Sequence, residues 1–323
     1  MERRAVIERT GGPEAIGWAD VDLPPPGPGE VRMRNMAVGL NYFDTYHRSG
    51  VYPVPLSSGR GMEAAGVVEA VGDGVDLAAG DRVATFGPLI GAYTTARNLP
   101  AAQLFRIPDD VDDRTAAAVL LKGCTAEFLA ERCVSVRPGE PVLVWAAAGE
   151  VGQLLVGWLK ALGAMVIGTV STEEKAARIR ELGADQAIVH RCGDVAARVR
   201  EITGGEGVAV SFDSVGQASW DASLASVRRR GVIVSYGNAG GPVTGVGLGV
   251  LAQRGSLFVT RPTLFDYYRE PAERRAGVER LWAMLRSGAV RPEIGRTFAL
   301  EEAADAHRVL EAGETQGSVV LVP

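Results

Sequence analysis

One stretch in the middle of the chain limits the folds open to it more than any other. Residues 142–146 form a continuous apolar run, which is typical of a parallel strand buried on both faces. A short turn at residues 146–152 follows, then a segment with apolar residues at helical spacing, and then a second apolar run at 164–170. The sequence therefore predicts a strand, a glycine turn, a helix and a parallel strand.

The same alternation continues toward the C-terminus. Apolar runs at residues 187–190, 208–212, 232–236 and 257–260 predict four more strands. Helical patterns lie between them at 171–182, 194–202 and 219–228, and the first of these starts like a capping box, with Ser171 three residues before Glu174. Six strands alternating with helices indicate an α/β fold with a doubly wound parallel sheet.

The first 120 or so residues have a different pattern. Short apolar runs alternate with turn signals such as Pro24-Pro-Pro-Gly-Pro-Gly29, which favours a small β-rich domain, and a helix follows at 113–133. The tail, with helices at 273–285 and 300–310 and a strand at 318–321, has no obvious place in the parallel sheet. We therefore expect a discontinuous β-rich domain of residues 1–122 and 261–323 around a nucleotide-binding domain of residues 123–260.

Composition excludes several classes of protein. The 323 residues are 46 % hydrophobic and 23 % charged, the balance of a soluble globular protein, and no run approaches the roughly 20 apolar residues of a membrane helix. A net charge of −5 argues against a general nucleic-acid binder. Three cysteines without metal-ligand or disulfide spacing, and no signal peptide, predict a cytoplasmic protein.

The glycine turn carries the strongest chemical signal. A dinucleotide pyrophosphate binds backbone N–H groups at such a helix start, and residues without bulk let the backbone approach it. The second strand ends at Ser171 without the acidic residue that binds the ribose of NAD, and Lys175, one of three lysines, lies one helical turn on. A hydroxyl and an ammonium suit a 2′-phosphate, so the pattern favours NADPH. A capped helix with a solvated lysine is the alternative.

Metal catalysis is not expected. The three histidines, His47, His190 and His307, do not pair with a cysteine at ligand spacing. Hydride transfer to an electron-poor acceptor needs no metal, because the cofactor carries the chemistry.

Beyond these local signals, the whole chain resembles the zinc-independent quinone oxidoreductases, the ζ-crystallin-like branch of the medium-chain dehydrogenase/reductases. Motifs in the same order along nearly the full length carry the resemblance. They include Gly39-Leu-Asn-Tyr-Phe-Asp-Thr-Tyr-His-Arg-Ser-Gly50, Gly61-Met-Glu-Ala-Ala-Gly66, Leu121-Lys-Gly-Cys-Thr125, the glycine turn, Phe212-Asp-Ser-Val-Gly216, Ser235-Tyr-Gly-Asn238 and Val259-Thr-Arg-Pro262.

The resemblance implies a GroES-like catalytic domain, built from both chain ends, next to a Rossmann domain that binds NADPH. It also implies a homodimer whose Rossmann domains pair edge to edge. The zinc-dependent relatives carry a histidine and a cysteine near the positions of Met62 and Asn41, so their replacement here implies an enzyme without catalytic zinc.

Site residues follow from the resemblance by position. Tyr46 and Tyr52, with Asn41, are expected to form the catalytic pocket for a planar substrate. The residues expected to bind the cofactor are Asn41, Thr125, Phe128, Ser214, Gly237, Asn238 and Thr260, with Gly149, Glu150, Val151 and Gly152 at the pyrophosphate and Ser171, Lys175 and His190 around the 2′-phosphate.

Two of these positions depart from the family pattern. Glu150 stands where the family typically has glycine, close to the expected phosphates. Either its side chain turns toward solvent or it weakens NADPH binding, and our hypothesis is that Glu150→Gly tightens binding. His190 stands where the family has tyrosine, and a protonated imidazole there would favour NADPH below about pH 6.5.

The function implied is NADPH-dependent reduction of a quinone or a related electrophilic carbonyl. One alternative is reduction of the activated double bond of an enone or alkenal on the same scaffold. Another is a non-catalytic, crystallin-like protein that binds NADPH without turnover. The motifs do not separate these, because function depends on the pocket.

Overall fold

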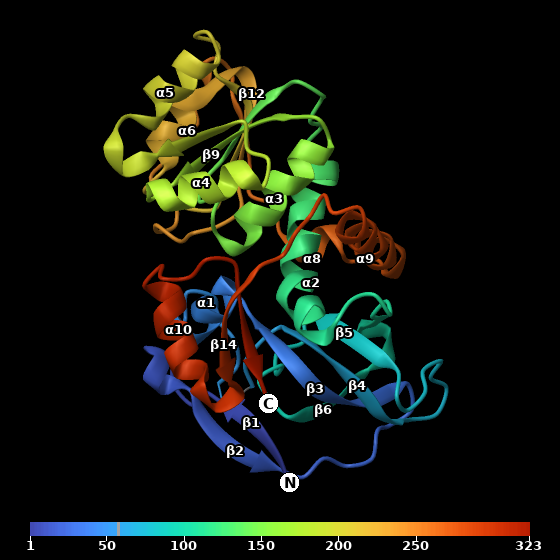
Figure 1. Cartoon of the computed structure of the whole chain (residues 1–323). Helices are drawn as coiled ribbons and strands as arrows, with labels where there is room; N and C mark the ends of the chain where they lie inside the picture. Colours follow the sequence, from blue (N-terminus) through green and yellow to red (C-terminus); the bar gives the residue numbers. More distant parts are fainter. Residues whose placement is uncertain (57–58) are drawn as a thin grey trace. The chain divides into compact units, whose positions relative to one another are not determined.

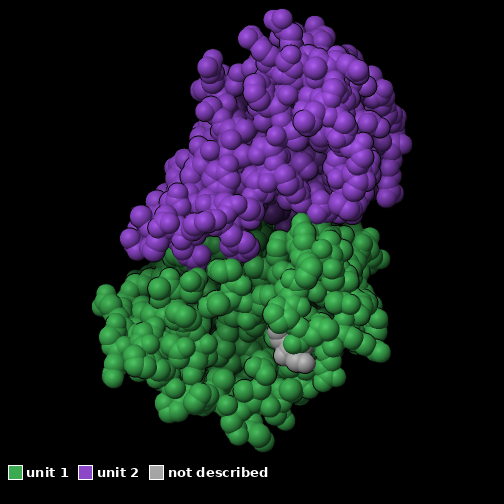
Figure 2. Space-filling model, turned by 180° about the vertical axis from the view of Figure 1, so that it is seen from behind, with its two compact units in different colours: residues 1–122, 292–323 green, residues 123–291 purple. Residues whose placement is uncertain are grey.

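Two stretches far apart in the sequence, residues 1–122 and 292–323, form one structural unit, and residues 123–291 form a second (Figures 1 and 2). We call them unit 1 and unit 2. The structure, a computed structural model, describes residues 1–56 and 59–323.

Unit 2 is built on a parallel sheet with strand order β10-β9-β8-β11-β12-β13, which confirms the predicted doubly wound fold. The apolar runs form these strands because both faces of the sheet are covered, and all six residues of β11 are buried. The strands are β8 (Pro141–Val144), β9 (Met165–Val170), β10 (Gln186–Val189), β11 (Val208–Asp213), β12 (Val227–Ser235) and β13 (Phe258–Thr260).

Helices connect these strands, as the sequence predicted. A buried cluster joins the sheet to α5 and α6 through residues such as Ile233, Val199 and Trp220. The helices are α3 (Glu150–Ala161), α4 (Glu173–Glu181), α5 (Val195–Ile202), α6 (Trp220–Ser226) and α7 (Gly249–Gln253), with a 3₁₀ turn η4 (His190–Cys192) after β10.

The second domain boundary lies at residue 291/292, whereas the sequence pattern placed it at 260/261. Segment 261–291 contains α8 (Leu264–Tyr267) and α9 (Pro271–Arg286), which remain in unit 2. They pack on the end of α2 (Asp113–Glu127) and on the π-helical turn η3 (Phe128–Cys133). The hydroxyl of Tyr268 donates to Glu127 at 2.7 Å, and Arg280 pairs with Glu131 at 2.8 Å, so polar bonds as well as packing hold this segment there.

Unit 1 contains a seven-stranded sheet that joins the two ends of the chain. Its order is β14-β15-β3-β4-β5-β7, with β6 paired to β3, and every pairing is antiparallel except β14 with β15. The strands are β3 (Glu30–Leu40), β4 (Glu63–Val71), β5 (Arg82–Phe86), β6 (Ala96–Pro100), β7 (Leu104–Arg106), β14 (Ile294–Ala299) and β15 (Ser318–Val322).

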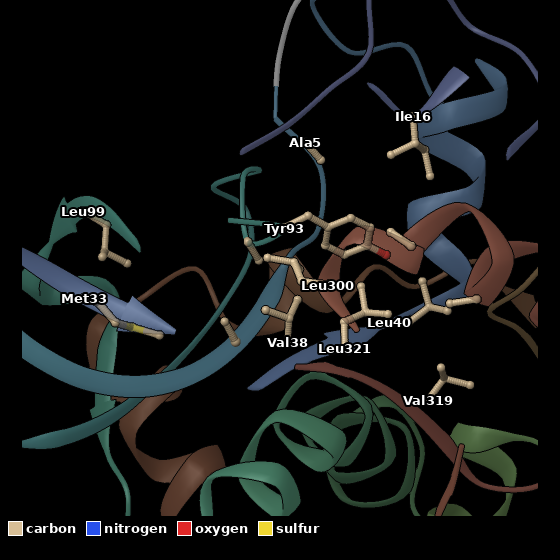
Figure 3. Packing of buried hydrophobic residues seen from close by; sticks show 14 of the residues in the cluster. Ala5, Ile16, Met33, Val38, Leu40, Tyr93, Leu99, Leu300, Val319 and Leu321 are labelled. Atoms are coloured by element: carbon tan, nitrogen blue, oxygen red, sulfur yellow. The ribbon is translucent and has the colours of Figure 1, made fainter. Parts of the chain in front are cut away.

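The core of unit 1 gathers apolar residues from the N-terminal strands, the sheet and the C-terminal segment. Figure 3 shows Tyr93 among them, with Leu300 and Leu321 from the far end of the chain. The remaining elements are a two-stranded sheet, β1 (Glu2–Val6) with β2 (Gly17–Val21), the short turns η1 (Pro13–Ala15), η2 (Ala101–Gln103) and η5 (Leu300–Glu302), and the helices α1 (Tyr42–Ser49) and α10 (Ala303–Glu311). Over residues 1–56 and 59–323, no helix is both long and apolar enough to span a bilayer.

Candidate active site

Most of the predicted cofactor residues of unit 2 lie at one edge of its sheet. Because all six strands are parallel, their carboxyl ends meet at that edge, where open α/β sheets bind ligands. Strand order reverses between β8 and β11, which places a switch point there. The structure brings these residues to the strand ends: Gly149–Gly152 after β8, Ser171 after β9, His190 after β10, Ser214 after β11, Gly237 and Asn238 after β12, and Thr260 at the end of β13.

The glycine turn is closed by its own backbone. Ala146 has φ +49°, and the N–H of Gly149 donates to its carbonyl at 2.8 Å. Gly149 is the N-cap of α3, and the first N–H groups of a helix have no acceptor within the helix itself. A Cβ on Gly152 would lie 2.4 Å from the carbonyl oxygen of Ala146, which leaves room only for glycine. The geometry fits an anion site at a helix N-terminus.

The end of β9 differs in one detail from the expected capping box. Thr172, rather than Ser171, is the N-cap of α4, and its hydroxyl accepts from the N–H of Lys175 at 3.3 Å. Ser171 is therefore left outside the helix, at the end of the strand, and Lys175 is half-buried in the first helical turn. A hydroxyl and an ammonium still stand at this strand end, as the NADPH prediction requires.

His190 is exposed at the start of η4. Partial burial and the neighbouring Arg191 lower the pKa of its imidazole below the usual 6.5. The imidazole therefore gains its charge at a lower pH than a free imidazole does, and any effect of that charge on a bound phosphate moves to lower pH with it.

The N–H of Tyr236 donates to the carbonyl of Asp213 at 2.8 Å, which ties the ends of β11 and β12 together. The carboxylate of Asp213 accepts from the N–H groups of Val215 and Gly216 at 2.9 and 3.0 Å, which shapes the turn after Ser214. A Cβ on Gly237 would lie 2.3 Å from the carbonyl oxygen of Ser214. These two predicted cofactor residues are therefore in direct backbone contact.

Thr125 and Phe128 lie on the α2–η3 segment of unit 2. Thr125 is half-buried, whereas Phe128 is buried and stacks on Tyr267 with ring centroids 4.8 Å apart. Phe128 thus packs α8 onto η3, a role that the sequence did not indicate.

In unit 1, Asn41 belongs to a buried polar cluster. Its amide nitrogen donates to Glu63 Oε2 at 3.0 Å and to the carbonyl of Gly39 at 3.3 Å. The ammonium of Lys122 donates to the same Glu63 oxygen at 3.0 Å, and the N–H of Leu121 donates to Glu63 Oε1 at 2.6 Å. Glu63 is 0 % and Lys122 1 % exposed, so the charges are compensated by each other rather than by water.

Tyr46 and Tyr52 are brought together by α1. Helix α1 ends at Gly50, whose φ of +87° turns the chain back, and the N–H of Tyr52 donates to the carbonyl of Tyr46 at 3.1 Å. Their ring centroids are 5.1 Å apart, and Phe43 lies 5.0 Å from Tyr52. Both tyrosines are half-buried, so this aromatic group offers ring faces and hydroxyls to a planar ligand.

The side chains of the site that the structure describes do not offer the set of donor atoms that a metal needs. Among residues 1–56 and 59–323, no group of three His, Cys, Asp or Glu side chains is arranged to hold a metal ion. The carboxylate that accepts from the Asn41 side chain, that of Glu63, also accepts from an ammonium and a backbone N–H. This donor set does not fit zinc.

Comparison with known proteins decides the family. Residues 27–109 match the family model described as alcohol dehydrogenase GroES-like domain, and residues 151–273 match the one described as zinc-binding dehydrogenase. A quinone oxidoreductase of Pseudomonas aeruginosa is 49 % identical over 100 % of both chains. This chain belongs to the quinone oxidoreductase family. It is an oxidoreductase of the medium-chain dehydrogenase/reductase superfamily.

Two further proteins match this chain over nearly its full length. A 2-haloacrylate reductase of a Burkholderia species is 45 % identical over 100 % of this chain and 99 % of its own length. The crystal structure of an Escherichia coli quinone oxidoreductase complexed with NADPH is 42 % identical, with a TM-score of 0.97 over 99 % of this chain and 100 % of that one.

Sequence reasoning missed the polar residues that support this quinone oxidoreductase site. Glu63 and Lys122 were read only as parts of motifs. Each stands directly beside an apolar run, Ala64–Val68 in β4 and Ala116–Leu121 in α2, and opposite charges beside two such runs are a signal for a buried pair. Helix α1 also had a signal, since Asn41 and Asp44 have the spacing of a capping box and Gly50 follows as a C-cap.

Proposed function

We propose that this protein is an NADPH-dependent quinone reductase that works without zinc. The observation that carries the proposal is the full-length similarity, at up to 49 % identity, to enzymes named quinone oxidoreductase. The carboxyl edge of the unit 2 sheet supports it, because a helix N-terminus, a hydroxyl and an ammonium stand where the pyrophosphate and the 2′-phosphate of NADPH would bind.

The residues divide between two tasks. Gly149, Glu150, Val151 and Gly152 would bind the pyrophosphate through backbone N–H groups, Ser171, Lys175 and His190 would surround the 2′-phosphate, and Thr125, Ser214, Gly237, Asn238 and Thr260 would line the rest of the cofactor. Asn41, Tyr46 and Tyr52 would receive the nicotinamide end and the quinone. When bound, NADPH supplies two electrons and a proton equivalent, and a further proton completes the hydroquinone.

The absence of zinc is argued from the donor atoms around Asn41. An amide takes the place of a thiolate, Met62 provides a thioether, and Glu63 is engaged by Lys122. A quinone needs no Lewis acid, since its carbonyls are already electron-poor.

A second candidate is reduction of an activated carbon–carbon double bond. The 2-haloacrylate reductase at 45 % identity favours it, because a haloacrylate carries such a bond next to a carboxylate. Both reactions use the same cofactor, so only the pocket separates them.

Steady-state oxidation of NADPH tests the proposal. With quinones of increasing size, and with enones and 2-haloacrylates as the second panel, we expect kcat/KM to be higher for quinones. A higher kcat/KM for the enones and 2-haloacrylates would instead support the second candidate function, reduction of an activated double bond. Tight NADPH binding with no turnover of either panel would instead support a non-catalytic, crystallin-like protein.

Lys175 tests the choice of cofactor. Lys175→Met removes the ammonium from the end of β9 and is expected to weaken NADPH binding about tenfold while leaving NADH binding unchanged. Arg180→Met, an exposed cation on the same helix, is the matched control and is expected to change neither. Calorimetry with both cofactors measures the effect, and an equal loss for NADPH and NADH would contradict the assignment.

We also propose a homodimer that joins two unit 2 sheets at β13. Among residues 1–56 and 59–323, this strand pairs with β12 alone, and its residues Phe258 and Val259 are 62 % and 39 % exposed. Leu248, before α7, is 80 % exposed. An apolar edge strand is a template for pairing with a second copy across a two-fold axis.

The expected effect of Phe258→Asp is a shift from dimer to monomer, because a carboxylate would be buried at the interface without a partner. Analytical ultracentrifugation at micromolar concentration measures it. Leu89→Asp, which changes an exposed apolar residue of unit 1, is the control and is expected to remain dimeric. A wild-type monomer would remove the proposal.

The cytoplasm is the proposed location. Cys124, Cys133 and Cys192 form no disulfide with one another, as expected in a reducing compartment.

A further inference from the structure

A chain of buried hydrogen bonds links Asn41 to the C-terminal helix of unit 1. The backbone N–H of Asn41 donates to Asp44 Oδ2 at 2.9 Å, and the hydroxyl of Tyr93 donates to the same oxygen at 3.1 Å. The Tyr93 hydroxyl lies 3.0 Å from His307 Nε2. Asp44, Tyr93 and His307 are each 0 % exposed, so these bonds do not compete with water.

The contacts of His307 decide which group donates in each of these hydrogen bonds. Arg48, on the last turn of α1, makes two bonds to Glu311, at 2.6 and 2.9 Å, and its Nη1 lies 3.4 Å from His307 Nδ1. A guanidinium can only donate, so Nδ1 accepts and the proton of the neutral imidazole is on Nε2. Burial, with the nearby Arg48 and Arg60, lowers the pKa of His307 to about 3, which keeps the ring neutral.

The donor and the acceptor of each hydrogen bond from His307 to Asn41 are then fixed. His307 donates to Tyr93, Tyr93 donates to Asp44, and Asp44 accepts from the N–H of Asn41. Burial raises the pKa of Asp44 to about 7, and the bonds from Asn41 and Tyr93 oppose that rise. They therefore stabilise the carboxylate form that holds the start of α1.

Asn41 is thus held at two points. Glu63 and Gly39 accept from its side-chain nitrogen, which turns the amide oxygen away from them, and Asp44 holds its backbone. The support for Asp44 comes from segments distant in sequence, and Figure 3 shows Tyr93 packed in the core of unit 1, where its ring has no freedom to swing.

We propose that Tyr93 and His307 are positioning residues that hold Asn41, through Asp44, in the orientation needed at the reacting end of the cofactor. This inference rests on the proposed function, which gives Asn41 its place in the reaction. Neither residue touches the cofactor or quinone. Both act only through the orientation of Asn41.

A double-mutant cycle tests the inference. Tyr93→Phe removes one hydroxyl and keeps the ring, and is expected to lower kcat/KM for the quinone about tenfold. In an Asn41→Ala background the same change is expected to have no further effect on kcat/KM, because the residue that it positions is gone. An equal fold loss in both backgrounds, or no loss in either, would overturn the proposal. His307→Gln provides a second route to the same cycle.

A matched control separates positioning from plain loss of stability. Thr94→Val removes the neighbouring buried hydroxyl, which bonds to the carbonyls of Arg3 and Ala96. These bonds do not involve Asp44, Tyr93 or His307. We expect it to lower Tm to a similar extent and to leave kcat/KM within about twofold of wild type. A tenfold loss of kcat/KM in Thr94→Val would make the effect of Tyr93→Phe a general one and overturn the proposal.

Hydrogen exchange gives a readout that needs no activity. If the wild-type enzyme reduces no quinone, the proposed function fails on its own, and the exchange rate of the Asn41 backbone N–H decides the inference. Faster exchange in Tyr93→Phe than in Thr94→Val supports it, and equal rates overturn it.

Discussion

Replacing Lys122 with methionine is expected to lower the free energy of unfolding by about 3–5 kcal/mol. The reason is the carboxylate that it leaves behind. Glu63 is fully buried, and its ammonium partner lies 3.0 Å away. In the variant, the N–H of Leu121 and the amide of Asn41 still donate to Glu63, but neither carries a charge. Urea denaturation followed by circular dichroism measures the change.

The double variant makes this prediction specific. Adding Glu63→Gln to Lys122→Met removes the uncompensated charge, so most of the lost stability is expected to return. Arg269→Met, which breaks the exposed pair with Asp266, is the control and is expected to cost less than about 0.5 kcal/mol. If the free energy of unfolding of Lys122→Met lies within about 1 kcal/mol of the wild-type value, the Glu63 carboxylate does not depend on Lys122 for its stability.

The parallel sheet of unit 2 could be predicted because its signal is local. Each strand is a short apolar run bounded by turn residues, and each is followed by a helical pattern, so the order of elements can be read directly. All six predicted strands are in the sheet. The predicted cofactor residues of unit 2 that follow these strands could be located for the same reason, since parallel strands bring their ends to one edge.

Element boundaries were harder to predict where tertiary contacts override local preference. The sequence placed residues 227–228 at the end of a helix, but Val227 pairs with Val208 and starts β12. Arg230, at φ +59°, and a register shift between Val208 and Val210 then bring the strand back into line. The second domain boundary differs from the predicted one for a similar reason. No feature in the sequence of α9 indicates the surface on which this helix packs.

The bonds from Tyr93 and His307 that support Asp44 could not be predicted from the sequence. His307 reaches Tyr93 because β15, from the end of the chain, joins the sheet of unit 1 and α10 lies in the same unit (Figure 1). A histidine on a helix is an ordinary residue until the fold gives it partners, and spacing carries no information about that.

The glycine turn leads to the second large expected effect. Gly152→Ala would place a Cβ 2.4 Å from the carbonyl oxygen of Ala146 and 2.8 Å from the Cα of Ala147. Both are backbone atoms, so no side chain can rotate away, and the start of α3 must move from the turn. We expect a loss of about 1–3 kcal/mol in the free energy of unfolding. A shift of about 1 Å in the N–H groups of the first turn is also expected to weaken NADPH binding about a hundredfold.

Variants at two further glycines distinguish an effect on stability from an effect on cofactor contact. Gly149→Ala adds a Cβ 3.1 Å from the same oxygen, a contact that small movement relieves, so we expect little change in unfolding. Its effect on NADPH then reports contact with the cofactor alone. Gly247→Ala, where a Cβ would meet no atom within 4 Å, is expected to change neither property. Wild-type stability in Gly152→Ala would show that the turn can relax. Lost stability with unchanged NADPH affinity would instead place the pyrophosphate elsewhere, because the helix start cannot move without moving the N–H groups proposed to bind it.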